Sequence, residues 1–291
     1  MMSSKSRFSM SAVRATLATL LIALFAIVLI PLQYLSVTLN LPTKRWIPVL
    51  FHRINCLALG VRKTVNGSCV KKGSVLITSN HCSWIDIVVL GSLQPLSFIA
   101  KSEVANWPIF GLFAKLQRSI FVNRSRRSET AQVAREIARR LKEGDAMVLF
   151  AEGTSSDGNQ VLPFRTSLIG AAKVAMTMNA NEPRSEEEKE PEKEEADQVW
   201  IQPLSIAYTA LHGLPMGRQH RHLAAWYGDM DLLPHLWVLL KEGALDVTLT
   251  YGEPIPFGPG ENRKEAALKA HEAVRQTMLR DLHHQTDPHR R

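Results

Sequence analysis

Cysteine is scarce in this sequence of 291 residues, and its arrangement suits neither disulfides nor zinc. The three cysteines, Cys56, Cys69 and Cys82, are odd in number and form no CxxC motif. This argues against the disulfide framework of a small secreted domain and against a structural zinc site. A reducing compartment is the simplest setting for such a chain.

Several chemical signatures are also missing: a GxSxG elbow, a metal-ligand set that activates water, an internal repeat and a nucleic-acid-binding module. The first two absences argue against common hydrolases. The last weighs against nucleic acid as a partner, although the net charge of +8 would suit one. Residues 181–198 hold nine acidic and three basic residues, which leaves +14 for the rest of the chain. That excess equally suits an anionic membrane surface or an acidic substrate.

Charge is absent from residues 15–39, a run of 25 residues. As a helix this run would be about 37 Å long, against a hydrocarbon core of about 30 Å. It shows no convincing cleavage site of a secretory signal, so we expect a membrane anchor. Pro31 leaves open whether the segment is a straight span or a shallow hairpin.

Basic residues flank this run unequally: five follow it within residues 44–63, and three precede it. The bias favours a body on the cytoplasmic side of an inner or cytoplasmic membrane. Residues 46–60 are largely apolar and are expected to lie along the membrane surface. We therefore predict an anchor and interfacial helix over residues 1–62, one folded domain over 63–282 and a loose tail over 283–291.

Apolar runs that predict strands alternate with helical patterns beyond the anchor. The predicted strands are 74–79, 96–101, 119–123, 146–150, 199–208, 222–228 and 245–252. The first predicted helix begins at residue 86, and the others cover residues 107–117, 129–142, 167–178 and 264–282. Such alternation predicts an α/β fold with a mostly parallel, mixed sheet flanked by helices. The acidic segment 181–198 is expected to be a disordered insertion.

Two candidate catalytic residues follow the first of these strands. His81 comes after strand 74–79, and Asp86 lies five residues later at the start of a helix. Sites in such sheets gather at the carboxyl ends of strands. A turn between the two residues would bring the carboxylate to one imidazole nitrogen and leave the other to take a proton from an alcohol. The structural alternative is that Asp86 forms a capping box with Ser83 and that His81 is an ordinary strand-end histidine.

Two further strand ends carry candidate ligand-binding residues. The first has Asn123 and Arg124, whose guanidinium group suits phosphate or carboxylate. The second is a turn with a carboxylate, a glycine and hydroxyls, followed by an arginine: Glu152, Gly153, Thr154, Ser155 and Arg165. A solvated arginine and an ordinary polar turn are the alternatives. Pro203, within strand 199–208, predicts a sheet edge or a bulge beside a site.

The order of these motifs resembles the glycerolipid acyltransferase family, and more narrowly the 1-acyl-glycerol-3-phosphate acyltransferases. HxxxxD at 81–86, FVNR at 121–124, FxEGTxS at 150–156 and a strand with an embedded proline occur in this order between about Ser74 and Tyr251. The resemblance implies that His81 is the general base and Asp86 its orienting partner. It implies that Arg124 and the Glu152-Gly153-Thr154 turn hold the polar head of the acceptor.

The resemblance further implies a membrane-bound enzyme that transfers a fatty acyl group to the hydroxyl of a lysolipid. The donor would be the acyl thioester of acyl carrier protein (acyl-ACP) or of coenzyme A (acyl-CoA). The reaction would use no cofactor and no metal, and it would form no covalent acyl-enzyme. The family commonly has arginine after Glu-Gly-Thr, where this chain has Ser155. Residues 152–168 and 225–237 resemble the branch that acylates lyso-ornithine lipid, which carries no phosphate. Lysophosphatidic acid stays open as acceptor, because Arg124 or Arg165 can contact phosphate.

Two alternatives belong to other functional classes. A non-catalytic, basic membrane-associated protein would account for the charge and the apolar run, but not for His, Asp, Glu and Arg at strand ends. A thioester hydrolase would share the donor, but the sequence has no nucleophile elbow.

The acidic insertion should be dispensable for turnover if it is a solvated excursion. We expect a deletion of residues 182–197 to leave acyl transfer within about twofold of the full chain, because such insertions are well tolerated. Transfer rates of both proteins at equal concentration in lipid micelles test this. A deletion variant that is folded but inactive would contradict it.

Overall fold

The computed structural model describes residues 4–71, 73–123, 143–166, 199–258 and 260–284, with parts of helices at 133–141 and 169–170. Arg124, the acidic segment 181–198, half of the predicted helix 129–142 and most of the predicted helix 167–178 lie outside the described residues. The predicted tail is described only at its first two positions.

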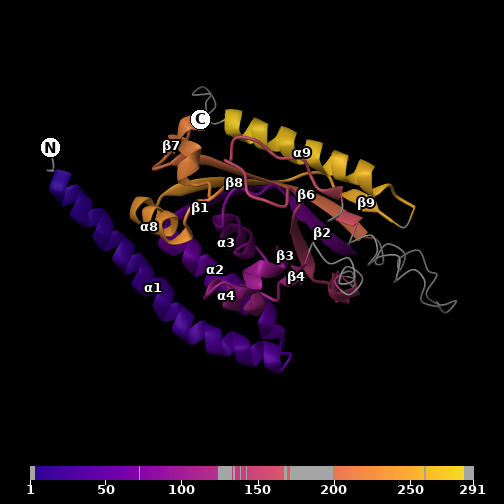
Figure 1. The fold of residues 1–291 in the computed structure, drawn as a ribbon, viewed down its shortest axis with the longest axis horizontal. Helices are drawn as coiled ribbons and strands as arrows, with labels where there is room; N and C mark the ends of the chain where they lie inside the picture. The colour runs from indigo at the N-terminus through magenta and orange to yellow at the C-terminus, as the bar shows by residue number, and fades with distance from the viewer. Residues whose placement is uncertain are drawn as a thin grey trace.

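One sheet organises the described domain (Figure 1), with the strand order β1-β8-β6-β2-β5-β3-β4 and with β7 and β9 paired to β6. The strands are β1 (Val61–Asn66), β2 (Ser74–Ser79), β3 (Leu96–Lys101), β4 (Ile120–Val122), β5 (Ala146–Phe150), β6 (Val199–Leu211), β7 (Leu214–Pro215), β8 (Leu245–Tyr251) and β9 (Ile255–Phe257). Strands β2, β3, β4 and β5 pair in parallel, as do β2 with β6 and β1 with β8. Only β7, β8 and β9 run antiparallel to β6 among the described pairs, so the predicted mixed, mostly parallel sheet is confirmed.

Helices cover both faces of the sheet (Figure 1). They are α1 (Ser4–Thr38), η1 (Pro42–Arg45), α2 (Trp46–Leu59), α3 (Ile85–Gly91), η2 (Ser102–Asn106), α4 (Phe110–Leu116), η4 (Arg218–Leu223), α8 (Leu232–Glu242) and α9 (Arg263–His284). One core joins the sheet to α1, α2, α3 and α8, and a second joins it to α9. In α9, Ala266, Ala270, Val274 and Met278 recur every fourth position and are buried, which gives the helix one apolar stripe against the sheet.

Two predictions for individual strands were wrong. Residues 222–228 form no strand: the first two belong to the helix η4, and the rest pair with no strand of the sheet. Pro203 lies neither at an edge nor in a bulge: β6 is central, and its irregularity falls at Tyr208 and Ala210. Proline is tolerated because Pro203 sits where the antiparallel neighbour of β6 changes from β9 to β8. There the side-chain amide of Gln202 donates to the carbonyl of Gly252 at 2.6 Å.

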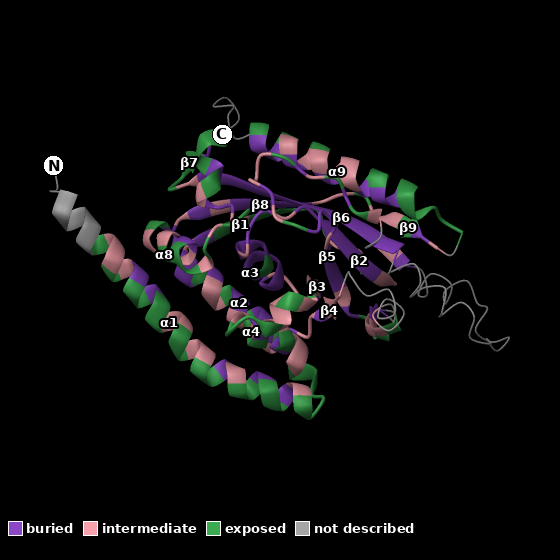
Figure 2. Ribbon diagram, viewed as in Figure 1, coloured by how far each residue is buried: buried purple, intermediate pink, exposed green. Residues whose placement is uncertain are grey.

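Helix α1 lies along the outside of the molecule, and much of its length is exposed or half-buried (Figure 2). Its section Met10–Thr38 is long and apolar enough to cross a membrane, and many of its large apolar side chains are exposed. Both halves nevertheless contact the domain. Arg14 donates to the carbonyl of Leu240 in α8, and Gln33 donates to the carbonyl of Leu116 in α4 at 2.7 Å. Pro31 falls inside a single helix, so the described segment forms no hairpin.

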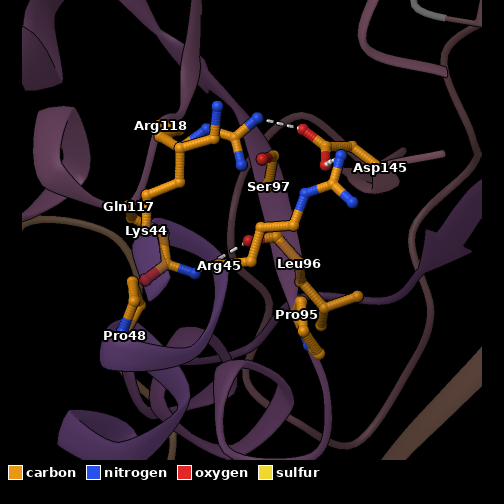
Figure 3. A pocket seen from close by; sticks show the side chains of 9 residues that line it. All are labelled: Lys44, Arg45, Pro48, Pro95, Leu96, Ser97, Gln117, Arg118 and Asp145. Carbon is orange, nitrogen blue, oxygen red and sulfur yellow. Dashed lines mark hydrogen bonds and ion pairs between the residues drawn. The ribbon is translucent and has the colours of Figure 1, made fainter. Parts of the chain in front are cut away.

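A cluster of ion pairs joins η1, which follows α1, to the amino ends of the parallel strands (Figure 3). Asp145, just before β5, is buried and pairs with Arg45 of η1 at 3.0 Å and with Arg140 at 3.2 Å. Arg118, which follows α4, donates to the same carboxylate. Arg45, Arg118 and Asp145 line a small hollow together with Lys44 and the start of β3. A single carboxylate thus holds guanidinium groups from three segments that are distant in sequence.

Replacing Asp145→Asn should destabilise the fold by about 3 kcal/mol, because breaking a buried ion pair leaves its partners without a counter-charge. The unfolding midpoint in detergent measures this. The matched control is Glu265→Gln, which removes an exposed helix pair with Lys269 and should leave the midpoint unchanged. Equal midpoints for the three proteins would contradict the structural role of Asp145.

Candidate active site

The carboxyl end of β2 is fastened to β6 by one side chain. The amide nitrogen of Asn80 donates to the carbonyl of Ile206 at 2.9 Å, and its oxygen accepts the N–H of Ile206 at 2.8 Å. Asn80 therefore replaces the ladder hydrogen bonds that stop where β2 ends. The next residue, His81, is in this way held at the edge of the sheet while the chain turns into α3.

His81 and Asp86 form a hydrogen-bonded pair. Nδ1 of His81 lies 2.8 Å from Oδ2 of Asp86, which sits in the first turn of α3. The carboxylate is fully buried, whereas the imidazole keeps 18% of its side-chain surface exposed. Nε2 makes no hydrogen bond to the described residues, so one ring nitrogen is oriented by the carboxylate and the other has no partner in the described part of the chain.

The buried carboxylate of Asp86 is satisfied by three further donors. Oδ2 accepts the backbone N–H groups of Cys82 at 2.8 Å and Ser83 at 2.9 Å. Oδ1 accepts the hydroxyl of Tyr208 at 2.7 Å. These hydrogen bonds offset the cost of burying a charged group. Because they fold the turn 81–84 around the carboxylate, they also explain how a spacing of five residues brings the pair together.

The capping-box alternative describes only part of this geometry. Asp86 does reach back to the N–H of Ser83, as the acidic residue of such a box does. The hydroxyl of Ser83, however, is buried without a hydrogen-bond partner, so it caps nothing. Asp86 instead bonds the turn and the imidazole at the same time.

Phe150, the last residue of β5, packs flat against the imidazole. The two ring centroids are 4.0 Å apart, with an angle of 16° between the planes. Phe98 of β3 stacks on Phe150 in turn, with the centroids 6.1 Å apart. One face of His81 is thus shielded by an apolar wall, which fixes the ring plane and limits water access from that side.

Glu152 forms a second buried carboxylate directly behind His81. Its Oε1 accepts the backbone N–H of His81 at 2.7 Å, and its Oε2 accepts the N–H of Leu162 at 2.8 Å. Burial raises the pKa of Glu152 to about 8, with the nearby Asp86 adding to the shift and the two backbone donors opposing it. Ser156 completes the fastening, because its N–H donates to the carbonyl of His81 at 2.8 Å.

The other predicted site residues surround this centre unevenly. Gly153 has a φ of +74°, which favours glycine, and its turn leaves Thr154 exposed and Ser155 half-buried. Arg165 donates to the carbonyl of Glu152 at 3.1 Å. Asn123 directly follows β4, at the carboxyl edge of the same sheet. The ligand-binding roles of these residues, and of Arg124 outside the described residues, stay predictions.

Sequence reasoning missed Asn80, Phe150 and Tyr208. Asn80 and Phe150 lie inside or beside the motifs but carry no obvious chemistry of their own. Tyr208 comes from the end of the predicted strand 199–208, where an aromatic residue looks like ordinary core. Its hydroxyl is the one sign available from sequence, since a buried tyrosine needs a partner.

Replacing Glu152→Gln should change how stability depends on pH. The folded-state pKa of Glu152 is raised from roughly 4.3 to about 8, so the folded protein holds a proton that the unfolded chain has released. Its contribution to stability is complete at low pH and is lost as pH rises toward 8. Unfolding free energies between pH 5 and pH 8 should therefore fall more steeply in the wild type than in the variant. Parallel profiles would show that Glu152 does not titrate in this window.

Comparisons with known proteins place the chain in a family. A family model described as Acyltransferase matches residues 61–207, from β1 into β6. The chain is 44% identical over 269 residues to "Lyso-ornithine lipid O-acyltransferase" of Rhizobium meliloti (strain 1021), covering 92% of this chain and 87% of that one. It is 47% identical over 247 residues to the protein of the same name in Brucella abortus (strain 2308), covering 85% and 87%.

A solved structure shares the fold. It is the crystal structure of the 1-acyl-sn-glycerophosphate (LPA) acyltransferase PlsC from Thermotoga maritima, with a TM-score of 0.58 and 21% identity over 93% of this chain and 97% of that one. At this identity the likeness supports the architecture alone. Together with the family match and the full-length relatives, the His81–Asp86 pair at the end of β2 leads to one conclusion: the chain belongs to the Acyltransferase family and is an acyltransferase.

Proposed function

We propose that this acyltransferase moves a fatty acyl group from a thioester to the free hydroxyl of lyso-ornithine lipid, with His81 as general base. The observation that carries the proposal is the His81–Asp86 pair, with one ring nitrogen bonded to a buried carboxylate and the other unbonded among the described residues. The names of two relatives that match most of the chain support the acceptor.

In the proposed reaction Nε2 of His81 takes the proton of the acceptor hydroxyl as its oxygen attacks the carbonyl carbon of the thioester. Asp86 stabilises the imidazolium that forms and keeps Nδ1 protonated. Collapse of the tetrahedral intermediate expels the thiolate, which takes up the proton from His81. Phe150 holds the ring plane and Glu152 holds the backbone of His81, so both act as positioning residues.

The third motif supports an acceptor without phosphate. Ser155 stands where the resembling family commonly has arginine, and it is a neutral, half-buried residue. Arg165 is a cation beside this turn, and its Nε donates to the carbonyl of Glu152. A phosphomonoester dianion would meet less positive charge at this turn than arginine at position 155 would give.

The donor is proposed to be acyl-ACP or acyl-CoA, and the enzyme is proposed to work at a cytoplasmic membrane surface. Support comes from the exposed apolar side chains of α1. Both halves of α1 are held by the domain, so any membrane that receives this helix must lie close to the body of the enzyme. This suits acceptors and products that stay in the bilayer.

The direct test offers purified enzyme two acceptors in micelles, lyso-ornithine lipid and lysophosphatidic acid, with acyl-ACP and acyl-CoA as donors. We expect transfer to lyso-ornithine lipid and at least tenfold less to lysophosphatidic acid. Preferred transfer to lysophosphatidic acid would refute the proposed acceptor. Release of free fatty acid without transfer to either lipid would favour a thioester hydrolase.

His81→Ala should lower kcat by on the order of 10³-fold, the usual contribution of a general base. Asp86→Asn should lower it by at least 10²-fold, because the imidazole then loses its orienting charge. The matched control is His212→Ala, which removes an exposed histidine that pairs with Glu242. It should leave kcat unchanged. Retained turnover in a folded His81→Ala variant would exclude the general-base role.

A further inference from the structure

Two loops are fastened to the backbone on either side of the His81–Asp86 pair. The loop after Glu152 is held by the hydrogen bond from the N–H of Ser156 to the carbonyl of His81. The segment after η4 is held by a 2.7 Å hydrogen bond from the N–H of Trp226 to the carbonyl of Cys82. Side chains carried by these loops therefore border the place where the acceptor hydroxyl must reach Nε2.

Arg221 of η4 joins the two loops and is buried without a carboxylate partner. Only 8% of the residue is exposed. Its Nη1 donates to the side-chain oxygen of Asn159 at 2.7 Å, while its Nε is buried with no hydrogen-bond partner. In the described part of the chain Arg221 forms no salt bridge.

Two half-buried guanidinium groups elsewhere in the described chain are better satisfied. Arg118 and Arg140 share the carboxylate of Asp145. A buried guanidinium group with an unused donor is costly unless an anion completes it, and its planar fork suits a carboxylate. Arg221 thus has the features of a residue that awaits an anionic ligand.

The surrounding charge distinguishes between kinds of anion. Asp157 lies two residues before Asn159 and accepts the N–H of Asn159 at 3.0 Å. Burial and the neighbouring positive charge of Arg218 lower the pKa of Arg221, and the negative charge of Asp157 opposes them without forming an ion pair with Arg221 among the described residues. Arginine and carboxylate side by side suit a headgroup that carries both a carboxylate and an ammonium.

We propose that Arg221 binds the carboxylate of an amino-acid headgroup on the acceptor lipid, with Asp157 facing the ammonium of the same headgroup. This inference rests on the proposed function and deepens it, because it names the residue that selects the acceptor. Asn159 positions Arg221, and the loop–loop contact sets the headgroup beside the His81–Asp86 pair. The selectivity then comes from a segment outside the four sequence motifs.

The test changes the charge on both partners of the contact. The probes are an N-(3-hydroxyacyl)ornithine in micelles and its carboxyl methyl ester, offered to wild type, Arg221→Lys, Arg221→Met and the control Arg218→Met. Arg218 lies in the same short helix and is exposed. We expect the wild type to prefer the free acid over the ester by about 30-fold in kcat/KM, as a hydrogen-bonded charge contact would give.

Arg221→Met should lose about 30-fold on the free acid and little on the ester, so that the preference disappears. Arg221→Lys should retain part of it, and Arg218→Met all of it. The unfolding midpoint of Arg221→Met should fall no more than that of Asn159→Ala, because the guanidinium group has one hydrogen bond, to Asn159, and no ion pair among the described residues. Equal losses on both lipids, a midpoint below that of Asn159→Ala, or an equal effect of Arg218→Met would overturn the proposal.

A binding measurement distinguishes failure of the proposed function from failure of the proposed binding site. If the wild type acylates neither ornithine lipid, equilibrium dialysis with the water-soluble N-(3-hydroxybutanoyl)ornithine and its methyl ester tests the binding site alone. If the acid binds more tightly than the ester, and Arg221→Met abolishes this difference, the proposed binding site is supported and only the proposed reaction is refuted. Binding that is equal for the two compounds would remove the site as well.

Discussion

The geometry of the active site depends on the carboxylate of Asp86. It is fully buried, and it accepts two backbone N–H groups of the turn after β2 and the hydroxyl of Tyr208 from β6 while bonding the imidazole of His81. A charged group at this depth is stable only when its hydrogen bonds are complete. The turn, the start of α3 and the central strand are therefore arranged around one oxygen pair, and the orientation of His81 follows from that arrangement.

Glu152 fills a different role although it is also a buried carboxylate. It bonds backbone N–H groups and not the imidazole, and burial raises its pKa to about 8. Asp86 has a histidine and a tyrosine hydroxyl as partners, so its charge is used in the proposed chemistry. Glu152 holds the chain on which His81 sits. Two carboxylates at neighbouring strand ends thus divide the work of proton transfer and of positioning.

Sequence periodicity predicted the sheet and the strand ends well, because buried parallel strands are nearly continuous apolar runs. It located His81 and Asp86, but the pairing itself rests on a turn whose shape no local pattern encodes. The prediction for Pro203 was wrong because the effect of a proline depends on which strand lies beside it. The prediction of a strand over 222–228 was wrong because an apolar run resembles a strand until its pairing partners are known. Tyr208 and Arg221 were invisible as site residues, since their roles arise from contacts with segments far away in sequence.

The two edges of the parallel strands are specialised in opposite ways. At the amino ends, Asp145 collects arginines from η1, from the end of α4 and from the helix at 133–141, so its charges are neutralised within the fold. At the carboxyl ends, two polar atoms have no hydrogen-bond partner among the described residues: Nε2 of His81 and Nε of Arg221. Stability favours the first arrangement, and the second is tolerated only where a substrate completes it. The contrast between the edges therefore separates the part of the molecule that stabilises the fold from the part that is proposed to bind the acceptor.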